Sequence, residues 1–323
     1  MNIPNIALVG NAPRDKHDIL NAMLAEDDLT DLCSITLYGA DGQPEMEALK
    51  DAVEDWRTGE IQGIVCLPMQ TSLRKAMNHA GINTDNILLI NATGNLLFST
   101  TNNSKSAEET TGLLNSDTIV NRAEMLARNL RRDFRIQNPR IAITSLNQQI
   151  DTDEESVEMK VIVPAITETV NKGIQTFGPY TVENLFPANS PSCAAESYDC
   201  IMTMYDGQCS NQSESLSDKP YVCIASGAEI PITQSEPAGI LNAIYAVIDI
   251  MRNRLEYDVP FANPLEKLYH ERKEGSDKTR FTVKKKGFNP AEHRRENITY
   301  VTKKKDDKDT TDNKENTDNT QDN

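Results

Sequence analysis

Several sequence patterns that would assign a chemistry are missing from this chain of 323 residues. Its six cysteines form no CxxC pair, and there is no GxSxG, HExxH or GxxxxGK[ST] motif and no GxGxxG after the first expected strand. The sequence therefore gives no support to a serine hydrolase, a zinc protease, a P-loop NTPase or a Rossmann dinucleotide site. Several cysteines lie in apolar runs such as GIVCLP and YVCIAS, which is typical of buried, reduced thiols.

Histidine is scarce, and its four positions are far apart: His17, His79, His270 and His293. None of them lies in a glycine-rich or acidic motif, and none occurs between positions 79 and 270. We interpret each as a surface or hydrogen-bonded histidine rather than a metal ligand.

Long apolar runs are also missing, since nowhere do 18 apolar residues follow one another. The first residues, MNIPNIALVGNAPRDK, lack a basic region ahead of a long apolar stretch. We expect neither export nor membrane insertion, and a cytoplasmic location.

Charge is unevenly distributed along the chain, whose net charge is −16. Residues 275–323 carry 12 basic and 10 acidic side chains, so the preceding residues carry −18. A body this acidic repels phosphate backbones and argues against nucleic-acid binding. Residues 273–323 are dominated by charge, Asn and Thr, which predicts a disordered tail.

Short β-rich runs alternate with helical patterns over the rest of the chain, which predicts an α/β fold with a mostly parallel sheet. Apolar residues occur at both parities in several runs, as in strands that are covered on both faces. The expected strands are NIALVG, SITLYG, GIVCLP, NILLIN, LLFSTT, RIAITS, DCIMTMY and YVCIASG.

Two helices are expected, over residues 116–134 and 235–254. In the first, Ser116 can cap the helix, and one apolar stripe is formed by Ile119, Ala123, Leu126, Leu130 and Phe134. The second is apolar around most of its circumference and has Pro237 in its first turn, so we expect it to be buried between layers.

Three polar segments could carry chemistry. Gly10 ends a strand, as in phosphate-binding loops, but one glycine is a weak signal. We interpret residues 151–158, DTDEESVE, as the start of a helix, where acidic residues favour the positive end of the helix dipole. The alternative is a Mg²⁺ site made by Asp151, Asp153 and Glu154. Residues 209–220, CSNQSESLSDKP, form a polar loop, either a surface excursion or a lid.

The order of several segments resembles the 4-hydroxythreonine-4-phosphate dehydrogenase family of vitamin B6 biosynthesis. That family carries PRIAVxGLNPHAGE, EExxxIxPA, GPxxADxxF, YHDQG and DHGTA. The corresponding segments here are PRIAITSLNQQIDT, VEMKVIVPAI, FGPYTVENLF, MTMYDGQCS and VCIASGAEIPITQS, and the first half follows the family order more loosely.

The resemblance implies an NAD-dependent oxidation and decarboxylation assisted by a divalent metal on three histidines. Here the NPHAGE histidine aligns with Gln149, the YHDQG histidine with Asp206, and the TTH histidine with Asn102. The DHGTA loop is shortened away between Ile232 and Ala238. Gln amides are poor ligands for transition metals, so we assign no catalytic or metal residue. A set of six residues, called the remnant set below, marks the expected cleft: Thr101, Asn102, Asn147, Gln149, Asp206 and Gln208.

By resemblance we expect a two-domain fold like that of isocitrate and isopropylmalate dehydrogenases. Its first domain would combine residues 1–139 and 232–272, and its second residues 140–231. We expect a homodimer and a divergent family member whose catalysis is lost or altered. Two alternatives stay open. The first is a metal- and NAD-dependent dehydrogenase with an oxygen-rich site around Asp206, acting on a phosphorylated hydroxy acid. The second is a non-catalytic binding or regulatory module that pairs with an active family member or senses a small anion, such as a small phosphorylated ligand.

Overall fold

The computed structural model describes residues 3–10, 29–39, 42–150, 153–187, 193–210 and 221–257, which all belong to one compact unit, Met1–Pro260. The predicted tail lies outside the described residues, as do His17, His270, His293 and the polar segment 211–220. Asp151 also lies outside them, so the predicted alternative of a Mg²⁺ site there stays a prediction.

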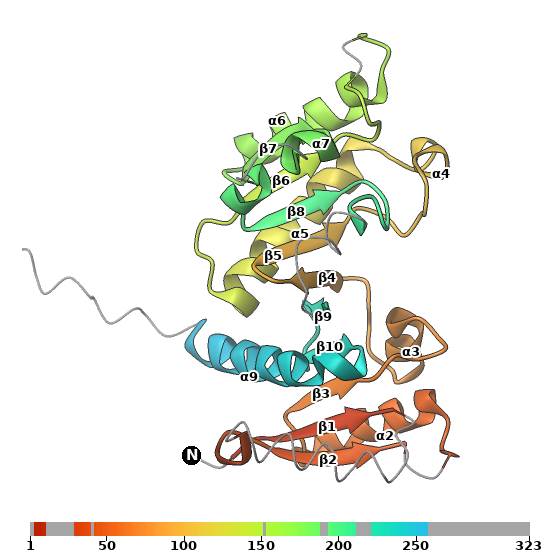
Figure 1. The fold of residues 1–323 in the computed structure, drawn as a ribbon, viewed down its shortest axis with the longest axis vertical. Coiled ribbons are helices and arrows are strands. Elements are labelled where there is room, and N and C mark those ends of the chain that lie inside the picture. The colour runs from red at the N-terminus through yellow and green to blue at the C-terminus, as the bar shows by residue number, and fades with distance from the viewer. Residues whose placement is uncertain are drawn as a thin grey trace, which may run out of the picture. The chain divides into compact units, whose positions relative to one another are not determined.

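The described strands form one mixed sheet in the order β2-β1-β3-β10-β9-β4-β5-β8-β6-β7 (Figure 1). Pairing is parallel except at the three contacts β10–β9, β9–β4 and β4–β5 in the middle of the sheet. The strands are β1 (Asn5–Val9), β2 (Ser34–Tyr38), β3 (Gly63–Cys66), β4 (Leu88–Thr93), β5 (Leu96–Thr100), β6 (Arg140–Thr144), β7 (Gln175–Tyr180), β8 (Cys200–Thr203), β9 (Val222–Ser226) and β10 (Ile232–Ser235). The α/β class and its mostly parallel sheet are confirmed.

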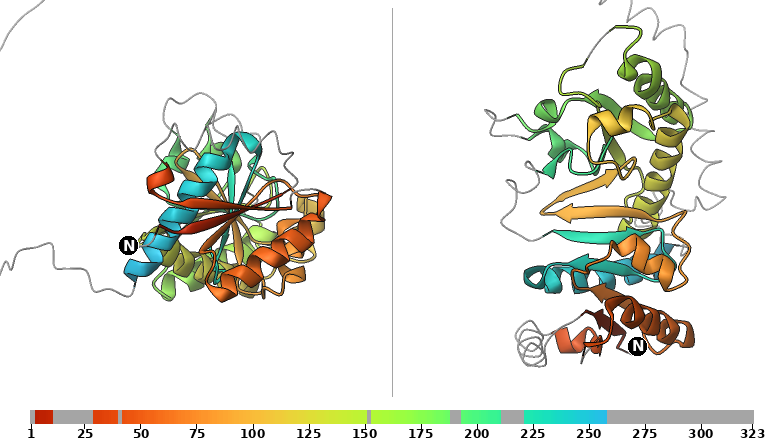
Figure 2. Two further views of the ribbon diagram at one scale, coloured as in Figure 1. Left: turned by 90° about the horizontal axis from the view of Figure 1, so that it is seen from below. Right: turned by 90° about the vertical axis from the view of Figure 1, so that its right-hand side faces the viewer.

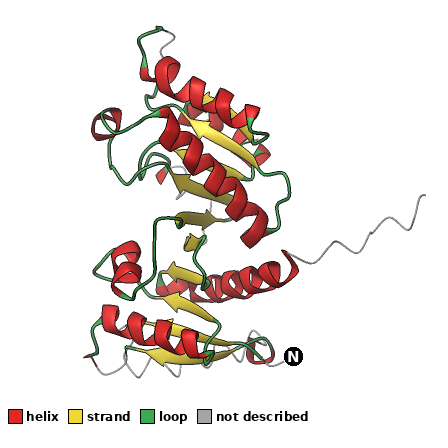
Figure 3. Ribbon diagram, turned by 180° about the vertical axis from the view of Figure 1, so that it is seen from behind, coloured by secondary structure: helices red, strands yellow, loops and turns green. Residues whose placement is uncertain are grey.

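Helices lie on both faces of this sheet (Figure 3). The α-helices are α2 (Glu45–Thr58), α3 (Leu73–His79), α4 (Ala107–Thr111), α5 (Ser116–Phe134), α6 (Val163–Asn171), α7 (Val182–Leu185) and α9 (Ile240–Tyr257). Shorter helical turns are Leu29–Asp31, Ala194–Ser197, Pro237–Gly239 and the π-helix Glu158–Ile162.

Successive residues of a strand point to opposite faces, and both faces of this sheet are buried. In β1, Ile6 and Leu8 pack in a cluster that includes residues of α5 and α9. Ala7 and Val9 pack on the other side with residues of α2 and α3. Figure 2 shows α9 in blue and α2 in orange on opposite sides of the red strands. This two-sided burial explains why the strand runs lack a clean polar alternation.

Helix α5 has the predicted bounds, but its cap differs from the prediction. Asn115, not Ser116, is the capping residue, and its side chain accepts a hydrogen bond from the Thr118 N–H at 2.7 Å. The Ser116 hydroxyl instead donates to the Val161 carbonyl at 2.9 Å, which ties α5 to the π-helix beside it. The helix ends at Phe134 because Arg135 adopts a left-handed conformation with φ of 56°.

The second predicted helix starts later than expected. Ser235 belongs to β10, Pro237 opens a single 3-10 turn, and α9 begins at Ile240. Two strands, β7 and β10, were not predicted. The first contains Gly178 and Pro179, and the second has four residues with Gln and Ser among them, so neither shows the usual apolar pattern. Strand β10 nevertheless joins β3 to β9 within the sheet. The predicted domain boundaries stay a prediction.

A buried carboxylate connects three elements near the end of α5. Asp133 is 0% exposed, and its Oδ1 accepts hydrogen bonds from the Nε atoms of Arg132 and Arg254, both at 2.8 Å. Its Oδ2 accepts from the Ser226 hydroxyl at 2.7 Å and from the Gly227 N–H at 3.3 Å. Asp133 thus joins α5 to α9 and to the end of β9.

The turn that Asp133 holds requires glycine. Gly227 has φ of +97°, and an added Cβ would lie 2.4 Å from the Asn86 carbonyl oxygen. The chain then returns as β10, antiparallel to β9. The position of β10 in the sheet therefore depends on a turn that a buried charge anchors.

Burial would raise the pKa of Asp133, but the hydrogen bonds and charges of Arg254 and Arg132 outweigh it and lower the pKa. We predict that Asp133→Asn lowers the free energy of unfolding by about 3 kcal/mol at pH 7, because both guanidinium groups lose their anionic partner. A carboxyl with a lowered folded pKa stabilises fully above its unfolded pKa and loses this effect as the pH falls. The difference between wild type and variant should therefore shrink below about pH 4.

Urea unfolding, monitored by circular dichroism at pH 7 and below about pH 4, measures the difference in the free energy of unfolding between wild type and variant. Glu54→Gln is the matched control, since it removes one negative charge from an exposed helix position. An equal loss in both variants would contradict a special role for Asp133.

Candidate functional site

A cavity of about 660 Å³ opens where the antiparallel strands meet their neighbours in the sheet. Its walls come from the start of α3, strands β4, β5, β9 and β10, one residue of α5 and the turn after β8. A volume of this size is typical of small-molecule sites. Polar lining residues include Ser72, Arg74, Asn91, Thr100, Thr101, Arg122, Thr203, Asp206, Gln208, Tyr221 and Gln234.

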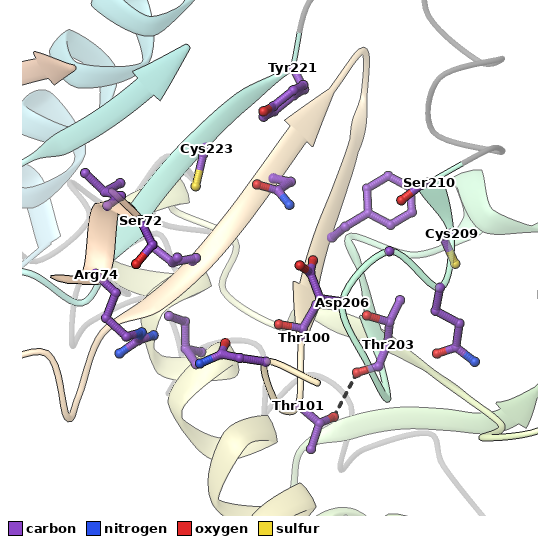
Figure 4. Close-up of a pocket in the computed structure, with 18 of the residues that line it drawn as sticks. Ser72, Arg74, Thr100, Thr101, Thr203, Asp206, Cys209, Ser210, Tyr221 and Cys223 are labelled. Carbon is purple, nitrogen blue, oxygen red and sulfur yellow. Dashed lines mark hydrogen bonds between the residues drawn. The ribbon is translucent and has the colours of Figure 1, made fainter. Parts of the chain in front are cut away.

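Three members of the remnant set line this cavity: Thr101, Asp206 and Gln208. The Thr101 hydroxyl donates to the Thr203 carbonyl at 2.9 Å, and its N–H donates to the same oxygen at 2.8 Å (Figure 4). Thr101 is 1% exposed. Its two hydrogen bonds fix the end of β5 to the end of β8. Asp206 is exposed and points into the cavity from the turn after β8.

The side-chain amide of Gln208 forms its hydrogen bonds within the chain. Its Oε1 accepts from the Thr144 hydroxyl at 2.8 Å and from the Met204 N–H at 2.9 Å. Its Nε2 donates to the Ser145 carbonyl at 2.7 Å. Gln208 therefore braces the turn after β8 against the end of β6, which makes it a structural member of the cavity wall.

The other three members of the remnant set, Asn102, Asn147 and Gln149, are not among the residues that line the cavity. The Asn102 Oδ1 accepts from the Ser104 N–H at 2.8 Å, while its buried Nδ2 has no hydrogen-bond partner among the described atoms. Gln149 is exposed. The structure therefore brings together half of the predicted set.

Asn147 is held by a residue that the sequence did not single out. Its N–H and its Nδ2 each donate to Oε1 of Glu158 at 3.1 Å, and Glu158 is 0% exposed. Glu158 opens the π-helix that precedes α6. The predicted helix start in residues 151–158 thus supplies an internal anchor for the loop after β6.

Two arginines from different helices face the cavity. Arg74 lies on α3 and Arg122 on α5. Burial and then the charge of Arg122 lower the pKa of Arg74, so the two cations are close enough to repel each other. Neither was singled out from the sequence, because they lie on separate helices and no motif links them.

Two cysteines also line the cavity, Cys209 and Cys223. Burial raises the pKa of each to about 12, so both are neutral thiols at neutral pH. A neutral thiol is a poor nucleophile and a poor metal ligand. Both cysteines therefore contribute to packing, as predicted for Cys223 in its apolar run; Cys209 lies in the segment that was predicted to be a polar loop.

The residues that the resemblance places at the metal-histidine positions do not fit the metal that it implies. Gln149 offers an exposed amide away from the cavity, and Asp206 offers one carboxylate. The segment between Ile232 and Ala238 forms β10 and a helical turn. Within the described part of the chain, no three His, Cys, Asp or Glu side chains group so that they could hold a metal ion.

Fold and cavity together define an α/β protein with a polar cavity of small-molecule size at the antiparallel centre of its sheet. The family model described as "Pyridoxal phosphate biosynthetic protein PdxA" matches residues 14–235. The chain belongs to the PdxA family.

Individual relatives agree with this family. A 4-hydroxythreonine-4-phosphate dehydrogenase from Bacteroides thetaiotaomicron is 28% identical over 267 residues, 73% of this chain and 71% of that protein. One from Erythrobacter litoralis is 34% identical over 131 residues, 40% of this chain and 37% of that protein. A crystal structure of such a dehydrogenase from Burkholderia phymatum has a TM-score of 0.54 at 14% identity, over 80% of this chain and 98% of that one, which supports the fold. None of the described helices is both long and apolar enough to span a membrane.

We predict that Gln208→Leu lowers the free energy of unfolding by about 2 kcal/mol, because Thr144, Ser145 and Met204 each lose a partner. Gln149→Leu is the matched control, and as an exposed substitution it should change stability by less than about 0.5 kcal/mol. Chemical denaturation of both variants measures the difference. Equal effects would mean that Gln208 does not brace the cavity wall.

Proposed function

We propose that this PdxA-family chain binds a small molecule in its cavity and does not perform the metal-dependent, NAD-linked oxidation that its resemblance to 4-hydroxythreonine-4-phosphate dehydrogenases implies. The supporting observation is the combination of a polar cavity with a donor set that lacks the three histidines. No histidine occurs between positions 79 and 270, so no local shift of the alignment restores them. A metal that polarises a hydroxyl and then a ketone needs several fixed ligands and an open position.

The residues that match the family motifs form hydrogen bonds within the protein and do not position reacting groups. Thr101 and Gln208 are committed to hydrogen bonds with the ends of neighbouring strands, and Asn147 is committed to Glu158. Structural residues are thus present where metal ligands are missing, which supports the proposal that the chain keeps the family scaffold and has lost the family reaction. We further propose that it works in the cytoplasm, where the buried thiols stay reduced.

A second candidate is a dehydrogenase with an oxygen-rich site, which the position of Asp206 in the cavity favours. Mg²⁺ prefers oxygen ligands and keeps several waters, so one carboxylate could take part in such a site. On this alternative, Asp206→Asn abolishes metal-dependent activity. On our preferred proposal, there is no such activity to abolish.

We predict no NAD reduction with 4-phosphohydroxy-L-threonine above a blank, with Mg²⁺, Mn²⁺ or Zn²⁺ added. Absorbance of NADH measures the rate, and the Bacteroides thetaiotaomicron relative is the positive control. A metal-dependent rate that Asp206→Asn removes would overturn the proposal and establish the second candidate. A metal-dependent rate unchanged in that variant would overturn both.

We also propose that the chain forms a homodimer, as its resemblance to the family implies. Size-exclusion chromatography with light scattering should give twice the mass of one chain. A mass equal to one chain over the working concentration range would contradict the dimer.

A further inference from the structure

The two cavity arginines, Arg74 and Arg122, are not explained by the scaffold of the family or by the loss of its metal site. They lie on helices α3 and α5, and each lines the cavity. Their side chains are half-buried, which weakens the screening of their charges by water. Two neighbouring cations on a wall of a cavity repel each other, and this arrangement costs free energy unless an anion lies nearby.

No described carboxylate pairs with Arg74. Its Nη1 donates to the Thr84 carbonyl at 2.7 Å and its Nη2 donates to the Ile87 carbonyl at 2.9 Å, and these acceptors are neutral. Its Nε is buried and has no partner among the described atoms. Asp85 attracts the guanidinium electrostatically, but no described carboxylate comes within ion-pair distance of it. These bonds fix the guanidinium in place.

Arg122 is less constrained. Within the described part of the chain, its guanidinium makes no hydrogen bond and no ion pair. This is unusual in a chain with 49 acidic and 33 basic residues, where acidic partners are abundant. Its donors therefore remain available to a molecule in the cavity, and a planar guanidinium matches an oxyanion in two parallel hydrogen bonds.

The cavity also restricts where an anion can lie. In Figure 4, Asp206 lies apart from Arg74, with Thr100 and Thr203 near it. A carboxylate there repels a second negative charge and favours hydroxyl or ammonium donors. The polarity of the cavity therefore favours an anionic group on the side of Arg74, away from Asp206.

From this geometry we infer that Arg74 and Arg122 form an oxyanion site, which takes the phosphate or carboxylate group of a small ligand. Arg74 is the fixed cation, and Arg122 is the adjustable one that closes on the anion. The inference rests on the proposed function, because it names the chemical group that the ligand-binding cavity accepts. It requires neither metal nor NAD.

The test measures anion binding by the full chain. Inorganic phosphate and malonate are titrated against a sodium chloride reference of equal ionic strength, by thermal shift and by calorimetry. We expect one anion per chain, from one or both probes, and about tenfold weaker binding in Arg122→Gln, which loses a charge-assisted pair of hydrogen bonds. Binding of phosphate alone, malonate alone or both identifies the preferred oxyanion.

Arg128→Gln is the matched control, since this exposed arginine lies on the same helix but not in the cavity. It should bind the anion as wild type does. Arg122→Lys keeps the charge without the planar fork and should bind between wild type and Arg122→Gln, which guards against a folding defect in the latter. No binding of either probe, or equal losses in the Arg122→Gln and Arg128→Gln variants, would overturn the site.

Separate results would overturn the proposed loss of dehydrogenase activity and the proposed oxyanion site. Metal-dependent NAD reduction would overturn the proposed function and leave anion binding as measured. Loss of anion binding would overturn this site and leave the absence of dehydrogenase activity as measured.

Discussion

The buried carboxylate of Asp133 is the constraint on which the middle of the sheet depends. It accepts hydrogen bonds from Arg132 on its own helix, from Arg254 on α9, and from the end of β9 and the turn that follows. That turn sends β10 back between β9 and β3, and this insertion makes one continuous sheet of the described strands. The cavity is lined by β4, β9 and β10 together, so its wall exists only when β10 is in place.

The same scaffold is compatible with our proposal that this chain keeps the family fold without the family reaction. Residues that hold strand ends together, such as Thr101 and Gln208, are occupied by hydrogen bonds within the chain. Positions that would present histidines to a metal carry an exposed amide at Gln149 and one carboxylate at Asp206. A cavity kept open by such bracing can still bind a ligand. Arg74 and Arg122 on its wall pair with no described carboxylate, which supports our proposal that such a ligand is anionic.

Sequence reasoning succeeded where a local pattern determines the structure. The apolar stripe of α5 gave its bounds, and the strand runs gave eight of the ten described strands. The cap of α5 was misplaced by one residue, because Asn115 and Ser116 are both good caps and only the distant Val161 carbonyl decides between them. Strand β10 was missed because its place depends on the turn held by Asp133, which lies far away in the sequence.

The candidate site was predicted only in part for a related reason. Alignment with family motifs predicts which residues replace the histidines, but not where their side chains point. Asp206 lines the cavity and Gln149 does not. Arg74 and Arg122 come together only because the sheet brings α3 and α5 to one cavity, and no motif predicts that meeting.

We propose that the scaffold is retained without the metal centre, and direct titration of metal into the full chain distinguishes this from a functional metal site. Calorimetry with Zn²⁺, Mn²⁺ and Mg²⁺ at neutral pH should detect no binding at the cavity, so any heat that is measured should be the same in wild type and Asp206→Asn. A one-to-one site with a dissociation constant in the micromolar range, lost in Asp206→Asn, would contradict the account.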